Sequence, residues 1–86
     1  MLSPFVGRSL LDPGLAFGKV LRQVRTEAGL TQEQLGLVAG VDRSFVSMVE
    51  RGINQPTIRM IFKFATALGV APSRLVELTE VQVLSS

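Results

Sequence analysis

Twenty residues in the middle of the chain, 32–51, constrain the fold more than any other stretch. They read QEQLGLVAGVDRSFVSMVER, a pattern of two short helices joined by a tight turn. Leu35 and Ala39 are four residues apart and therefore share one face of the first helix. Gly36 has no side chain and permits a close approach of the second helix, and Gly40 can take the left-handed backbone that ends a helix. The stretch therefore predicts two helices that meet at a sharp corner.

The second helix of this pair has an apolar edge and a polar edge. At about 100° per residue, its apolar positions fill an arc of roughly 140°, and they are Val41, Phe45, Val46 and Val49. The opposite side carries Arg43, Ser44, Ser47, Met48 and Arg51, and Glu50 falls on the boundary. A helix anchored by one edge, with an outward edge that has no acid, is typical of a helix-turn-helix that enters the DNA major groove.

Three ordered segments resemble the Cro and phage-repressor (Cro/C1-type) helix-turn-helix family, also called the xenobiotic-response-element type. They are FGKVLRQVRTEAGLTQEQL, AGVDRSFVSMVERGINQPTI and FATALGVAPSRL, within residues 17–78. The resemblance implies an all-α fold, a compact five-helix Cro/repressor-like domain. Its helix-turn-helix would consist of the second and third helices.

Capping signals locate the five expected helices. The first begins at Asp12-Pro13 and runs to about Ala28, before Gly29. Thr31 with Gln34 forms a capping box for the second helix, while Asp42 and Thr57 cap the third and fourth. The fourth ends at Gly69, with an expected core stripe of Ile58, Ile61, Phe62, Ala65 and Leu68. The fifth begins near Pro72, and the resemblance implies a serine and an acid as its capping pair, at the positions where this chain has Ala71 and Arg74.

We expect one domain, residues 13–80, between an N-terminal arm of residues 1–12 and a C-terminal tail of residues 81–86. The arm could be a disordered terminus, it could insert Arg8 into the DNA minor groove, or it could form a flap over a partner subunit. The flap would use Phe5, Val6, Leu10 and Leu11.

Hydrophobic residues make up 47% of the 86 residues, which is high for a small monomer and suggests a surface covered by a second copy. A homodimer is expected because one module supplies few base contacts, and a two-fold pair reads a palindromic operator. The candidate dimer surface is the fifth helix and the tail, through Leu75, Leu78, Val81, Val83 and Leu84. Alternatively, Leu75 and Leu78 close the core of the monomer.

Composition argues against several function classes. The chain has no Cys and no His, so we expect no disulfide, no metal site, no cofactor and no enzyme activity. It has no membrane-length apolar run and no signal peptide, so a cytoplasmic protein is expected, and the resemblance implies one of bacterial or phage type. The net charge of +2 is only weakly basic, but four cations and one acid lie between Arg43 and Lys63.

The outward side of the third helix supplies the candidate DNA base contacts. Arg43 can bind guanine O6 and N7 bidentately, although a solvated or phosphate-bound arginine is the alternative. Ser44 can donate or accept, and Ser47 lies one turn further along. Met48 could pack on a thymine methyl group, although a methionine at helical spacing is more often part of a core.

Residues around this helix are candidate DNA phosphate contacts. The resemblance implies that Gln32 binds a phosphate and braces the first residue of the recognition helix. Further phosphate contacts are expected from Arg51, Asn54, Gln55, Thr57 and Arg59. The resemblance also implies a structural ion pair between Arg25 and Glu50. Phe45 is expected in the core or on the loop 53–56.

The leading interpretation is a sequence-specific transcriptional regulator that binds double-stranded DNA and has no effector domain or small-molecule ligand. Within this class, a stand-alone repressor or activator, a controller protein of a restriction–modification system, and an antitoxin remain open. A protein-interaction module on the same fold is an alternative of a different class.

Overall fold

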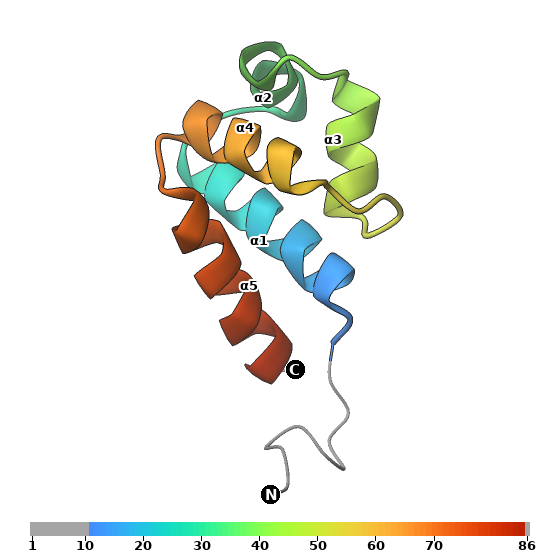
Figure 1. Cartoon of the computed structure of the whole chain (residues 1–86). Coiled ribbons are helices and arrows are strands. Elements are labelled where there is room, and N and C mark those ends of the chain that lie inside the picture. The colour runs from blue at the N-terminus through green and yellow to red at the C-terminus, as the bar shows by residue number, and fades with distance from the viewer. Residues whose placement is uncertain (1–10, 86) are drawn as a thin grey trace, which may run out of the picture.

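The computed structural model describes residues 11–85, and these residues form five α-helices without a β-strand (Figure 1). The helices are α1 (Pro13–Glu27), α2 (Gln32–Ala39), α3 (Arg43–Glu50), α4 (Ile58–Leu68) and α5 (Pro72–Ser85). The predicted all-α class and five-helix order are confirmed, with helix boundaries within two residues of those expected for the first four helices.

Two helices, α3 and α5, pack directly against α1. Figure 1 shows α5 along one side of α1, α4 beside it, and the α2–α3 pair at the far end of the molecule from the C-terminus. Close packing joins α1 to α3 and α5, and α4 to α2 and α5. The core between them is aliphatic with two phenylalanines: Phe17, Val20, Leu21, Val24, Leu35, Ala39, Val46, Val49, Phe64, Ala65, Leu68 and Leu75. α3 is thereby held by Val46 and Val49, and its other side is left facing outward.

Local capping explains why the helices begin where they do. The Asp12 carboxylate accepts hydrogen bonds from the N–H groups of Gly14 (2.9 Å) and Leu15 (3.2 Å). At the start of α2, the Thr31 hydroxyl accepts from the Gln34 N–H (3.0 Å), and the Gln34 side chain accepts from the Thr31 N–H (2.8 Å). This is the predicted capping box, which satisfies two donors that a helix start otherwise leaves unpaired.

The backbone of α3 and of the turn before it comes very close to two glycines, one on α2 and one on α1. A Cβ atom on Gly36 would lie 2.7 Å from the carbonyl oxygen of Val41, so the corner between α2 and α3 depends on glycine there. On α1, a Cβ atom at Gly18 would lie 2.4 Å from the carbonyl oxygen of Val49 and 2.6 Å from that of Glu50. The turn itself uses Gly40 at φ 76°, a left-handed conformation that glycine adopts without strain.

The expected core stripe of α4 was wrong at two positions. Phe64 is fully buried, whereas Ile58 and Phe62 are more than half exposed. Because α4 has apolar residues on more than one side, its sequence pattern does not determine which side faces the core. The exposed pair Ile58 and Phe62, one turn apart, adds to the apolar surface of the molecule.

At the C-terminal end, α5 continues through Ser85, so residues 81–85 are helical rather than a separate tail. Leu75 is fully buried in the core and Leu78 packs against it, which removes Leu75 from the expected dimer surface. The expectations for Phe5, Val6, Arg8 and Leu10 lie outside the described residues. Within residues 11–85, none of the helices combines the length and the apolar character that a bilayer span requires.

Candidate nucleic-acid interface

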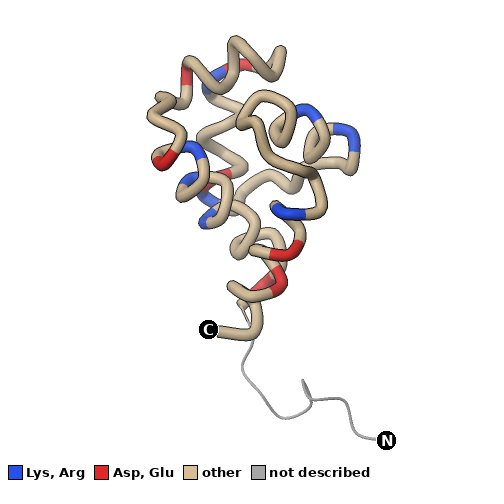
Figure 2. Tube along the Cα trace, turned by 90° about the vertical axis from the view of Figure 1, so that its left-hand side faces the viewer, with Lys and Arg blue, Asp and Glu red and all other residues tan. Residues whose placement is uncertain are grey.

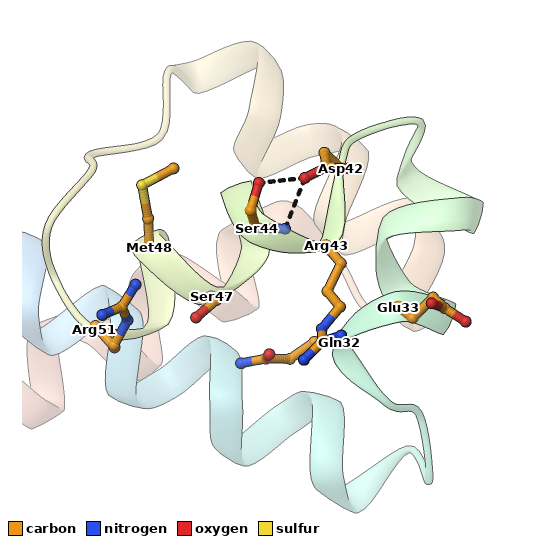
Figure 3. Close-up of a pocket in the computed structure, with 8 residues that line it drawn as sticks. All are labelled: Gln32, Glu33, Asp42, Arg43, Ser44, Ser47, Met48 and Arg51. Carbon is orange, nitrogen blue, oxygen red and sulfur yellow. Dashed lines mark hydrogen bonds between the residues drawn. The ribbon is translucent and has the colours of Figure 1, made fainter.

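The outward side of α3 borders an open hollow of about 530 Å³. Figure 3 shows its lining residues, which come from α2, from the turn and from α3 itself: Gln32, Glu33, Asp42, Arg43, Ser44, Ser47, Met48 and Arg51. All four predicted base-contact residues and two of the predicted phosphate-contact residues are among them. The structure therefore brings together most of the residues that the sequence pattern selected.

Helical spacing arranges the α3 side chains in two rows. Arg43, Ser47 and Arg51 succeed one another at four-residue intervals along one row, and Ser44 and Met48 form the other. In Figure 3 the Ser44 and Met48 side chains lie on the opposite edge of α3 from Arg51 and Ser47. The arginines and Ser44 are exposed, and Ser47 and Met48 are half-buried. This surface offers two guanidinium groups, two hydroxyls and a thioether to a ligand.

Asp42 fixes the start of α3. Its carboxylate accepts hydrogen bonds from the N–H of Ser44 (3.0 Å) and from the Ser44 hydroxyl. These bonds hold the pKa of Asp42 below its ordinary value because they stabilise the ionised form. The stabilisation that the Asp42 cap gives to folding is therefore present above the ordinary pKa and is lost as the pH falls through the lowered pKa.

A buried charge network fixes the other end of α3. The Arg25 side chain of α1 meets the Glu50 carboxylate through two bonds, Nε–Oε2 at 2.6 Å and Nη2–Oε1 at 3.0 Å. The Arg25 and Glu50 side chains are 11% and 3% exposed. The Glu50 hydrogen bond raises the pKa of Arg25, against the opposing effect of burial. Arg25 Nη1 also donates to the carbonyl oxygen of Leu30 at 2.9 Å, which ties the α1–α2 loop to the same group.

Gln32 joins this network from α2. Its Nε2 donates to Glu50 Oε1 at 3.0 Å, so Gln32 braces the last residue of α3, where the sequence interpretation had it brace the first. Side chains from α1 and α2 thus both donate to one carboxylate, which belongs to the last residue of α3. Within residues 11–85, every buried side-chain nitrogen and oxygen has a hydrogen-bond partner.

The structure separates the predicted phosphate-contact residues. Arg51 lies in the hollow with Gln32, and Asn54 lies beside Met48, to which its amide donates. The Thr57 hydroxyl accepts from the Met60 N–H (3.1 Å) and caps α4. Gln55 and Arg59 are placed elsewhere: Gln55 lines a groove with Pro13, Gly14 and Phe17 on α1, and Arg59 lines another with Val38, Phe62 and Lys63.

Sequence reasoning missed one residue that borders the hollow, Glu33 of α2, and one in the separate α2–α4 groove, where Lys63 lies one turn after Arg59. Helical spacing would have paired Arg59 with Lys63, but only the packing of α2 on α4 places them beside Val38.

The described lysines and arginines are absent from one end of the molecule, whereas acids occur at both ends. Figure 2 shows no Lys or Arg in the described part of the end that holds the C-terminus. After Arg74, the charged residues of α5 are the acids Glu77 and Glu80. Among residues 11–85, no group of three or more His, Cys, Asp and Glu is arranged to hold a metal ion. The end that carries α3 is therefore the one suited electrostatically to a polyanion.

Comparison with known proteins identifies relatives of this chain. Residues 21–75 match the Helix-turn-helix family. Over 70 residues the chain is 36% identical to an uncharacterized HTH-type transcriptional regulator, y4dJ, of Sinorhizobium fredii, covering 81% of this chain and 91% of that protein. It is 34% identical over 68 residues to control protein C.BamHI of Bacillus amyloliquefaciens, covering 78% and 84% of the two chains.

Solved structures include similar folds. The restriction-modification controller protein C.AhdI from Aeromonas hydrophila is 46% identical, with a TM-score of 0.69 over 71% of this chain and 92% of that one. The wild-type restriction-modification controller protein C.Esp1396I is 26% identical, with a TM-score of 0.78 over 86% and 97% of the two chains. The arrangement of the five helices is thus shared with solved controller proteins.

We predict that Glu50→Ala destabilises the protein by about 3–5 kcal/mol, because it leaves the Arg25 charge buried without its partner. Chemical denaturation followed by circular dichroism measures this loss. Glu33→Ala is the matched control, since Glu33 is an exposed glutamate on α2 and should change stability by no more than about 0.5 kcal/mol. Equal stability of the two variants would contradict a structural role for the Arg25–Glu50 pair.

Proposed function

The chain belongs to the Helix-turn-helix family, and on that premise we propose that it is a transcriptional regulator that reads double-stranded DNA through the outward side of α3. The observation that carries the proposal is the two-sided character of α3. Val46 and Val49 are fully buried, while Arg43, Ser44, Ser47 and Met48 line an open hollow on the opposite side.

Each residue on this side has a distinct proposed role. Arg43, in the first turn of α3, reads guanine through a bidentate hydrogen bond. Ser44, Ser47 and Met48 read neighbouring bases. Arg51 and Gln32, at the margin of the hollow, bind backbone phosphates and set the register of α3 without reading sequence.

We further propose that two copies bind together to a palindromic operator. Support comes from apolar side chains that remain exposed on α5: Val76 (51%), Val81 (53%) and Leu84 (40%). Ile58 (70%) borders the same groove as Val76 and extends this surface onto α4. Covering it with a second copy would remove apolar area from water and place two α3 helices on one duplex.

A second candidate role is more specific, namely a controller protein of a restriction–modification system. It is favoured by the similarity to C.BamHI across most of both chains and by the 46% identity to C.AhdI. The alternative within this class is a stand-alone regulator, and y4dJ is named only as an uncharacterized HTH-type transcriptional regulator.

For the DNA-binding role, we expect selection from random duplex DNA to enrich palindromes that are bound in a salt-dependent manner. Arg43→Ala should relax the preference at one base pair per half-site, at a cost of about 1–3 kcal/mol in discrimination. Arg51→Ala should weaken binding to all DNA sequences alike. It should also reduce, by about one, the slope of the logarithm of affinity against the logarithm of salt concentration. Fluorescence anisotropy against salt measures both.

Arg74→Ala serves as the control for these two variants, because Arg74 is paired with Glu77 on α5. It should leave affinity and salt slope unchanged. If Arg43→Ala and Arg51→Ala behaved identically, the assigned roles would be wrong. If no duplex bound, the protein-interaction alternative would be favoured.

For the dimer, Val76→Glu and Leu84→Glu should each shift the protein to a monomer in sedimentation equilibrium, because a carboxylate would have to be buried at the interface. Leu37→Glu is the control. Leu37 is 77% exposed on α2, outside the proposed interface, and its substitution should leave the dimer intact. A dimer that survives both α5 substitutions would refute this surface.

For the controller role, we expect the gene to lie beside genes for a DNA methyltransferase and a restriction endonuclease. The purified protein should protect the promoter of that gene set from nuclease digestion, and Arg43→Ala should abolish the protection. A different gene neighbourhood, or an unprotected promoter, would leave the stand-alone regulator as the better description.

A further inference from the structure

We infer that Asn54 is a positioning residue for Met48, and that the pair reads the methyl group of a thymine. This inference rests on the proposed function, since it assumes that α3 enters the major groove. It assigns to Asn54, a residue of the loop after α3, a part in sequence recognition. The sequence alone had suggested a phosphate contact for Asn54.

Three hydrogen bonds join the loop to Met48. The Asn54 side-chain Nδ2 donates to Met48 Sδ, at 3.8 Å. The backbone N–H groups of Ile53 and Asn54 both donate to the Met48 carbonyl oxygen, at 2.9 Å and 3.2 Å. The backbone bonds fix where Asn54 sits relative to Met48, and the side-chain bond then reaches the thioether. Both Asn54 and Met48 are half-buried, which shields these bonds partly from water.

The contact restricts a side chain that is otherwise adaptable. Methionine has three rotatable bonds, and its sulfur accepts but cannot donate a hydrogen bond. A donor held at the sulfur therefore selects a few rotamers and leaves mainly the last torsion, which moves the terminal methyl group. Fixing the side chain before DNA arrives reduces the entropy lost on binding.

The position of Met48 determines which DNA group it can recognise. Met48 follows Ser44 on one row of α3 and lines the hollow together with Arg43 and Ser47 (Figure 3). A thioether methyl has no hydrogen bond to offer a base edge. The apolar group that base pairs present in the major groove is the C5 methyl of thymine, so a positioned Met48 should prefer thymine there.

The experiment replaces the thymines of the selected operator, one at a time, with deoxyuridine, which lacks only the methyl group. Wild-type protein should bind about fourfold more weakly when one particular thymine per half-site is replaced, equivalent to losing one buried methyl group. Asn54→Ala and Met48→Ala should both lose this thymine–uracil difference. The preference for the guanine read by Arg43 should persist in both variants.

Gln55→Ala is the matched control. Gln55 is the next residue of the same loop, but its side chain lies over Gly14 on α1, so the thymine–uracil difference should be retained. Thermal unfolding of each variant establishes that it is folded. If Asn54→Ala unfolds, Asn54→Asp provides the test, because a carboxylate keeps the size of the side chain but cannot donate to sulfur.

Two outcomes would overturn the inference while leaving the proposed function intact. One is an equal loss of affinity for thymine and uracil operators in Asn54→Ala, which would mark a phosphate contact. The other is that wild-type protein binds the thymine operator and every uracil-substituted operator with equal affinity. Absence of salt-dependent binding to any duplex would instead refute the proposed function itself.

Discussion

The orientation of α3 depends on the buried carboxylate of Glu50. Arg25 from α1 and Gln32 from α2 both donate to it, and Arg25 also holds the carbonyl of Leu30 in the loop between those helices. Apolar contacts at Val46 and Val49 hold α3 against the core but are not directional, whereas these bonds have fixed geometry. One charged group at the end of a short helix thus sets where the polar side of that helix points.

The sequence was most informative where structure is decided locally. Asp12, Thr31, Asp42 and Thr57 each cap the helix expected from them, because a cap involves residues only two or three positions away. It was least informative where two apolar stripes compete. Nothing local to α4 distinguishes Phe62, which is exposed, from Phe64, which is fully buried, because that choice is made by the helices packed against α4.

In the candidate site, too, the sequence predicted what is decided within one helix and failed where tertiary packing decides. Arg43, Ser44, Ser47 and Met48 could be selected from the sequence because helical spacing alone puts them opposite a buried edge. Beyond the helix, spacing no longer applies. The loop after α3 turns Asn54 back to Met48 but carries Gln55 to α1, and α4 takes Arg59 to a groove beside Val38. Neighbours in sequence thus acquire different surroundings through tertiary packing.

The close crossing at Gly18 has a consequence for how such a protein can diversify. With a carbonyl oxygen 2.4 Å from where a side chain would begin, α1 and α3 meet backbone to backbone, and this position has no room for even a methyl group. The outward residues of α3 take no part in that crossing. Substitutions among those outward residues can therefore change the surface that α3 presents without disturbing the backbone crossing that holds the helix in place.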